Sequence, residues 1–157
     1  MTTQGMFPVT IQASPEAVWR WVGDLSRHPD WSPKPYTVEC VSGEPNQVGS
    51  RYRSVGWIPG DKDHGNDVEI IEVVPAARLV LRAVDAQGSF ENTYTLTPVD
   101  GGTEVTFTLV FPPMTGMSAL LVPVLFPLVG KADIRKRMGL LEGKVEGSAA
   151  EVTGASG

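Results

Sequence analysis

The chain has 157 residues, a formal net charge of −5 and 41% apolar residues, which suits one folded domain with its own apolar core. The acidic balance excludes a basic surface that neutralises phosphates, so we expect no nucleic-acid partner. The lone Cys40 cannot form an internal disulfide, and the chain does not begin with a basic segment followed by an apolar one. We therefore expect a reducing, cytoplasmic location.

The beginning of the chain predicts a strand and two short helices. Apolar side chains alternate over residues 7–11, as in a half-buried strand. Ser14 can cap a helix and Pro15 suits its first turn, and apolar residues recur at helical spacing as far as Leu25. Residues 26–33 interrupt this helix with prolines but leave room for one more short helical turn.

Six further strands are predicted in the middle of the chain, separated by short turns. They span residues 36–40, 51–57, 68–74, 79–84, 90–97 and 105–111. We expect residues 59–66 to form a loop and the Asp-Gly-Gly sequence at residues 100–102 to form a hairpin turn. Consecutive strands joined by short turns form an antiparallel sheet, so the chain predicts a single α+β domain over residues 1–147.

After two successive prolines the apolar period changes from two to about 3.6 residues, which predicts a long C-terminal helix from Met117 to about residue 145. Pro123 and Pro127 lie inside it and predict a kink or a break. The first half of this helix is apolar on nearly every side, so we expect it to be buried. Residues 148–157 are small and polar, which predicts a disordered tail.

Residues 105–130 contain no charged side chain, and these 26 residues are enough to cross a bilayer. The first part of the stretch alternates like a strand, however, and prolines interrupt the second part. Both features favour a last strand followed by the start of a helix in a folded domain. We therefore expect no transmembrane segment.

Several short segments carry a family resemblance when they are taken together and in this order. They are residues 11–19 (Ile-Gln-Ala-Ser-Pro-Glu-Ala-Val-Trp), Asp24, residues 29–33 (Pro-Asp-Trp-Ser-Pro), residues 48–51 (Val-Gly-Ser-Arg), residues 73–80 (Val-Val-Pro-Ala-Ala-Arg-Leu-Val) and residues 100–106 (Asp-Gly-Gly-Thr-Glu-Val-Thr). Together, and over roughly residues 5–147, they resemble the START-like superfamily (SRPBCC proteins), in particular its polyketide cyclase/dehydrase and lipid-transport branch.

The resemblance implies a helix-grip fold, in which a curved seven-stranded antiparallel sheet wraps around the C-terminal helix and encloses an elongated apolar cavity. The family has no universal catalytic motif, so the resemblance implies a class of hydrophobic ligand and not a reaction. Pro123 and Pro127 depart from the plainest family pattern, which has no proline inside the long helix.

Metal and cofactor motifs are incomplete. Residues 61–72 come close to a calcium-binding loop, but the Asn and Gly needed at its fifth and sixth positions are reversed, as Gly65 and Asn66. The two histidines and Cys40 do not have the spacing of zinc ligands. The sequence also has no nucleophile elbow and no phosphate-binding glycine loop. We therefore expect no metal and no cofactor.

Polar and aromatic side chains on otherwise apolar faces are the candidate ligand contacts, together with apolar residues of the last strand and the long helix. The candidates are Trp31, Arg53, Trp57, Phe90, Asn92, Tyr94, Phe107, Leu109, Met117, Leu121 and Leu125. Asn92 and Tyr94 can either line a pocket or make structural hydrogen bonds. For Arg53 an exposed position on its strand is favoured.

These residues predict a protein that binds a small or medium hydrophobic molecule, such as a lipid, an isoprenoid, a polyketide or an aromatic metabolite. An enzyme of the cyclase, aromatase or dehydratase type is an alternative. Glu72 is its best candidate carboxylate, although two successive isoleucines obscure which way Glu72 faces.

A further alternative is an adaptor that binds a membrane surface or a protein through the C-terminal helix. The cations of this helix, for which a solvated face is favoured, are Lys131, Arg135, Lys136 and Arg137.

Overall fold

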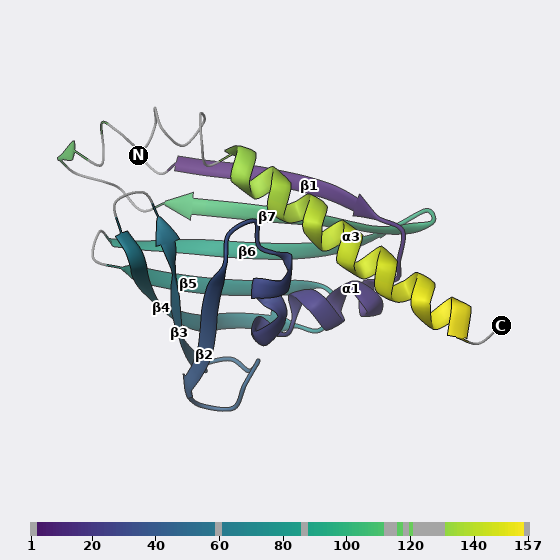
Figure 1. Cartoon of the computed structure of the whole chain (residues 1–157), viewed down its shortest axis with the longest axis horizontal. Helices are drawn as coiled ribbons and strands as arrows, with labels where there is room; N and C mark the ends of the chain where they lie inside the picture. The colour runs from purple at the N-terminus through teal and green to yellow at the C-terminus, as the bar shows by residue number, and fades with distance from the viewer. Residues whose placement is uncertain are drawn as a thin grey trace.

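The structure is a computed structural model that describes residues 3–58, 61–85, 88–111, 116–117, 120 and 131–155. In this part of the chain seven strands form an antiparallel sheet in the order β1-β7-β6-β5-β4-β3-β2 (Figure 1). The strands are β1 (Thr3–Ile11), β2 (Tyr36–Ser42), β3 (Arg51–Ile58), β4 (Asp61–Val74), β5 (Arg78–Asp85), β6 (Gly88–Val99) and β7 (Gly102–Phe111). The helices are α1 (Pro15–Val22), the 3₁₀ helix η1 (Leu25–Trp31) and α3 (Lys131–Ala155).

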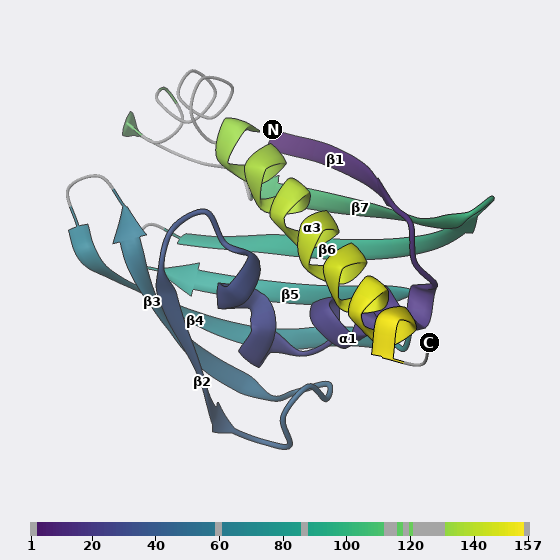
Figure 2. The same cartoon turned by 45° about the vertical axis from the view of Figure 1, so that its right-hand side comes forward.

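The sheet is curved, and α3 lies diagonally across its concave face (Figures 1 and 2). The helices α1 and η1 connect β1 to β2 and lie over the same face, beside α3. Alternate side chains of β7 are buried, as the period of two predicts for a sheet with one covered face. The strand order, the two short helices and the C-terminal helix confirm the predicted α+β helix-grip fold.

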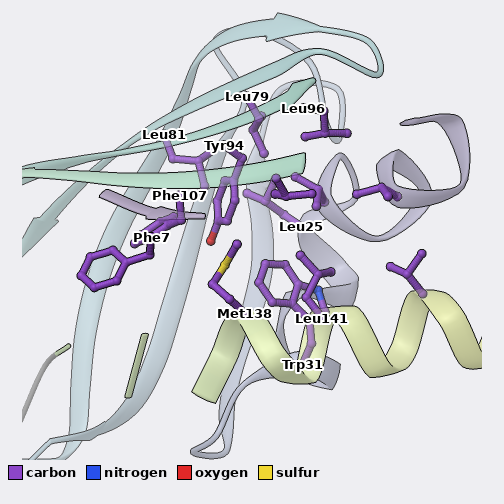
Figure 3. Close-up of a cluster of buried hydrophobic side chains, with 14 of the residues drawn as sticks. Phe7, Leu25, Trp31, Leu79, Leu81, Tyr94, Leu96, Phe107, Met138 and Leu141 are labelled. Atoms are coloured by element: carbon purple, nitrogen blue, oxygen red, sulfur yellow. The ribbon is translucent and has the colours of Figure 1, made fainter. Parts of the chain in front are cut away.

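The hydrophobic core fills the space between the sheet and the helices (Figure 3). Met138 and Leu141 of α3 lie 3% and 0% exposed opposite the strands, and Trp31 of η1 is 0% exposed between them. Tyr94 extends from β6 toward Met138 and Trp31. The chain therefore brings its apolar residues together from elements that are far apart in sequence.

Polar contacts fix α3 at two points along its length. Lys34, which follows η1, forms an ion pair with Asp133 in the first turn of α3 (2.8 Å). Farther along the helix, Glu146 accepts a hydrogen bond from the backbone N–H of Gln12 (2.9 Å). These exposed contacts tie α3 to neighbouring segments on either side of the apolar stripe that packs it against the core.

The prediction of a loop at residues 59–66 is wrong for most of its length, because β4 already begins at Asp61. Its inward-facing side chains are polar there, so the alternation of apolar and polar residues that marks a strand is absent. A register shift between Ile70 and Glu72 shows a bulge in β4, which accounts for the break in alternation at the two isoleucines.

The C-terminal helix differs from its prediction in two respects. In the structure α3 extends through Ala155, whereas composition alone predicted a disordered tail from Ser148; alanine and glutamate in this stretch favour a helix. Most of the predicted first half, including Pro123 and Pro127, lies outside the described residues. Met117 and Leu120 are described and are 71% and 72% exposed, so the prediction that they are buried is wrong. The spacing of apolar residues shows which of them share a face but does not show whether another element covers that face.

No helix in the described part of the chain is long and apolar enough to span a membrane.

Two glycine substitutions test how the fold is held. Gly139 is exposed inside α3 and a methyl group added there meets nothing within 4 Å, so Gly139→Ala should raise the free energy of unfolding by about 0.5–1 kcal/mol. The control is Gly102→Ala in β7, whose added methyl group meets the carbonyl oxygen of Ile11 and should lower stability. Urea denaturation measures both changes, and a loss of stability in Gly139→Ala would contradict the exposed position of that helix face.

Candidate functional site

A cavity of about 270 Å³ lies between the concave face of the sheet and the segment that joins η1 to β2. Its apolar lining comes from Leu25, Val38, Val68, Leu81, Ala83 and Phe90. Its polar lining includes His28, Tyr36, His64, Asn66, Asn92, Tyr94 and Arg137. The cavity therefore combines an apolar floor with a set of polar groups at its edges.

The strands present the floor because alternate residues of each face the helices. On β6, Phe90 and Asn92 lie opposite Ala83 and Leu81 of β5 in the antiparallel ladder. Val68 of β4 lies opposite Ala83 from the other side. The bulge that follows in β4 turns Glu72 away from this face, and Glu72 instead forms an ion pair with Arg78 (3.0 Å). Glu72 is therefore not a carboxylate of the cavity.

Arg137 of α3 is the central polar group of the cavity roof. Its guanidinium carbon lies 4.6 Å from the ring centre of Trp31 and 5.8 Å from that of Tyr36, distances at which a cation is attracted to an aromatic face. Its Nη2 donates to the hydroxyl of Tyr36 (3.3 Å), while its Nε is buried without a hydrogen-bond partner. Arg137 is only partly exposed, so the predicted solvated position is wrong for it, because aromatic side chains from three other elements converge on the helix face that carries it.

The charge of Arg137 influences the protonation of its neighbours. Burial and the nearby guanidinium lower the pKa of His28 to about 3, so this histidine is neutral at physiological pH. Its Nε2 lies 2.8 Å from the carbonyl oxygen of Val22, to which it donates. Burial raises the pKa of Tyr94 and of Tyr36 although Arg137 opposes the shift, so both phenols keep their protons.

Two amides of the cavity have an unsatisfied oxygen. The Oδ1 atoms of Asn66 and Asn92 are buried and have no hydrogen-bond partner in the described structure. A buried acceptor without a donor costs about 1–3 kcal/mol, and such a group calls for a partner that is not part of the protein. Of the two interpretations left open for Asn92, the missing partner favours pocket lining over a structural hydrogen bond.

His64 lies in the cavity wall between two carboxylates. Its Nε2 is 3.0 Å from Asp85 and its Nδ1 is 3.3 Å from Asp61, and the imidazole is 14% exposed. Tyr36, Gly56 and His64 lie in one row across β2, β3 and β4. A Cβ added at Gly56 would lie 2.9 Å from the Cβ of Tyr36, so the absence of a side chain here allows Tyr36 to lie close against β3. Among the described residues no group of three His, Cys, Asp or Glu side chains is arranged to hold a metal ion.

The structure brings four of the predicted ligand contacts to the cavity, namely Trp57, Phe90, Asn92 and Tyr94. Trp57 is 48% exposed at the rim, where the ammonium of Lys34 lies 5.2 Å from its ring centre. Whether any of the four touches a ligand stays a prediction.

The other predicted contacts lie elsewhere. Trp31, Phe107 and Leu109 are buried in the core behind the cavity wall. Arg53 faces outward, forms an ion pair with Asp67 (2.8 Å) and has a half-exposed side chain. Met117 is exposed, and Leu121 and Leu125 lie outside the described residues.

The sequence carried signals for the residues that were missed. Arg137 stands three residues after Ile134 and four before Leu141, which places it on the buried stripe of α3. His64 and Asn66 alternate in phase with Val68 and Ile70, which places all four on one face of β4. In each case a polar side chain at an inward position was assigned to solvent because of its chemistry.

Comparison with known proteins gives a family and a fold. A family model described as polyketide cyclase / dehydrase and lipid transport matches residues 6–146. Comparison with curated protein sequences gives no significant match.

Three solved structures illustrate the shared fold. The Zhui aromatase/cyclase from Streptomyces sp. R1128 is similar with a TM-score of 0.77 and 16% identity, covering 93% of this chain and 94% of that chain. TTHA0849 from Thermus thermophilus has a TM-score of 0.69 and 22% identity, covering 93% and 99% of the two chains. CV1439 from Chromobacterium violaceum has a TM-score of 0.71 and 18% identity, covering 92% and 98%. At these identities the likeness shows the helix-grip fold alone.

The buried neutral histidine predicts a pH-dependent stability. Between pH 6.5, its ordinary pKa, and about 3 in the folded protein, the unfolded chain binds a proton at His28 that the folded chain does not. The contribution of neutral His28 to the free energy of unfolding is therefore fully present above pH 6.5 and decreases as the pH falls. The decrease between pH 7 and pH 5 is about 2 kcal/mol. His28→Gln should remove this loss in urea denaturation. His64→Gln changes the other histidine and is the control; an unchanged pH dependence in His28→Gln would refute the assignment.

Proposed function

Because this chain belongs to the polyketide cyclase / dehydrase and lipid transport family, we propose that it binds a small apolar molecule in the cavity between its sheet and α3. The observation that carries this proposal is the apolar floor of the cavity together with the unpaired oxygens of Asn66 and Asn92. Apolar ligand surface buried against Leu81, Ala83 and Phe90 would stabilise the complex by about 25 cal/mol per Å² before ordering costs.

The size of the cavity limits the ligand. A volume of about 270 Å³ lies just below the range of roughly 300–1,000 Å³ that is usual for ligand pockets. Among the predicted ligand classes, this favours a compact aromatic metabolite or a short polyketide over a long-chain lipid. The aromatic wall of Phe90 and Tyr94 suits a planar ring system, which can stack or meet the rings edge to face.

Filling the cavity tests this proposal. Ala83 is 3% exposed and lines the floor, so Ala83→Phe places a ring where the ligand would lie. We expect the affinity for the neutral fluorescent probe N-phenyl-1-naphthylamine to fall by at least about tenfold, measured as saturable fluorescence. The matched control is Val84→Phe, because Val84 is the next residue of β5 and is 44% exposed on the other face. Equal binding by the two variants would contradict a ligand site at this floor.

An enzyme of the cyclase or dehydratase type is the second candidate, and the position of His64 favours it. Asp85 orients the imidazole through Nε2 (3.0 Å), and the more exposed Asp61 lies 3.3 Å from Nδ1. A bound carbonyl compound that takes the place of Asp61 at Nδ1 would meet a ring nitrogen that can move a proton. Tyr36 lies two strands away in the same row, about 10 Å between Cα atoms.

A simple diketone tests the second candidate. Aldol cyclisation of 2,6-heptanedione releases water and forms 3-methylcyclohex-2-enone, which is followed by its ultraviolet absorbance. If His64 moves the protons, the protein should accelerate enone formation over buffer, and His64→Gln should reduce the rate by about 100-fold or more while N-phenyl-1-naphthylamine still binds. Glu72→Gln is the control, because Glu72 does not line the cavity and forms an ion pair with Arg78. A rate that is the same in the wild type and His64→Gln would rule out this role.

A further inference from the structure

Arg137 is a positive charge without a negative partner. The ion pairs among the described residues involve six acidic residues and never Arg137. Its surroundings are aromatic faces, the phenols of Tyr36 and Tyr94 and the neutral His28. A buried charge is normally paired, since leaving it unpaired is strongly unfavourable. This arrangement therefore lacks an anion.

The groups around Arg137 are arranged as hydrogen-bond donors. Arginine offers five N–H donors, of which one goes to the hydroxyl of Tyr36 and another, on Nε, has no partner. The hydroxyl of Tyr36 accepts this bond and so can donate its own proton onward. The face of Trp31 holds the guanidinium plane from one side. A fixed, planar set of donors is the geometry that recognises a group with two or more oxygens.

The position of this donor set ties it to the cavity. Arg137, Tyr36 and Tyr94 all line it, and the side chain of Tyr94 extends from β6 toward α3 beside Met138 and Trp31 (Figure 3). Asn92 follows on the same face of β6, two residues before Tyr94. The side of the cavity formed by Arg137, Tyr36 and Tyr94 is therefore cationic and carries donors, Asn92 beside it offers an acceptor oxygen, and the floor is apolar.

We infer that the ligand of this cavity is an apolar molecule with an anionic oxygen group, such as a carboxylate, an enolate or a phenolate, and that Arg137 binds this group together with the hydroxyl of Tyr36. The inference rests on the proposed ligand-binding function and specifies the class of ligand. Neutral lipids and hydrocarbons are disfavoured, because they would leave the buried guanidinium without an anion.

Two probes with one skeleton test the inference. Both 1-anilinonaphthalene-8-sulfonate and N-phenyl-1-naphthylamine carry the same rings, and only the first has an anionic group. The wild type should bind the sulfonate at least about tenfold more tightly. Arg137→Met and Arg137→Gln should abolish this preference while the affinity for the neutral probe stays within about twofold. Arg137→Lys should keep part of the preference, because the charge remains but the planar donor set is lost.

Control variants separate this role from surface charge and from folding. Arg135→Gln removes the same charge from an exposed position of α3 and should leave the preference unchanged. Because the ligand-free guanidinium is unpaired, the melting temperature of Arg137→Met should equal or exceed that of the wild type. A purely structural role predicts a lower melting temperature instead.

The outcomes distinguish the two proposals. Binding of both probes with equal affinity by the wild type, or an undiminished preference for the sulfonate in Arg137→Met and Arg137→Gln, overturns the inference and leaves the proposed function intact. Absence of saturable binding for either probe overturns the proposed function as well. If Arg137→Met does not fold, the comparison of Arg137→Gln with Arg135→Gln decides the question.

Discussion

The packing of one partly buried guanidinium, that of Arg137, against aromatic rings is the constraint on which the cavity depends. Arg137 needs the ring of Trp31 from η1, the hydroxyl of Tyr36 from β2 and the nearby phenol of Tyr94 from β6. These elements meet only if α3 crosses the sheet at a fixed angle, which the ion pair of Lys34 with the helix helps to set. The same charge helps to keep His28 neutral. The same contacts of Arg137 therefore influence both how these elements pack and which groups of the cavity carry a charge.

This arrangement is unfavourable by itself. The buried Nε of Arg137 and the buried Oδ1 atoms of Asn66 and Asn92 have no hydrogen-bond partners in the described structure, and each such atom costs about 1–3 kcal/mol. The apolar core around Leu141 and Tyr94 supplies stability in excess of this cost. Unpaired donors and acceptors that a stable core holds in place are preorganised, so a ligand that satisfies them need not order them first.

Local patterns in the sequence predicted the fold well. Alternation along β7 and the helical stripe of Ile134, Met138 and Leu141 identify their inward faces without any knowledge of neighbours. Strand β4 was partly missed, since its inward side chains near Asp61 are polar and break the apolar pattern. Periodicity therefore determines which face is inward, whereas composition alone does not show that a polar residue occupies it.

The candidate site was predicted less completely. Asn92 and Tyr94 were found because they are polar groups on an apolar strand face. Arg137 was assigned to solvent although its spacing places it on the buried stripe, because arginine is rarely buried without a partner. What reverses that expectation is the convergence of Trp31 and Tyr36 on the helix. Residues 31, 36, 94 and 137 come from four separate elements, and no local pattern records their meeting.

Two polar groups of the cavity, Arg137 with Tyr36 and His64 with its carboxylates, would give a bound ligand one preferred orientation. An anionic oxygen held by Arg137 and Tyr36 would direct the rest of an apolar molecule over the cavity floor, whose lining also includes His64. In the proposed enzymatic function the guanidinium would stabilise negative charge on oxygen, and the imidazole oriented by Asp85 would exchange a proton once the ligand takes the place of Asp61. Binding and proton transfer thus require the same orientation of the ligand. The proposed binding function and the proposed enzymatic function therefore call on the same residues of the cavity.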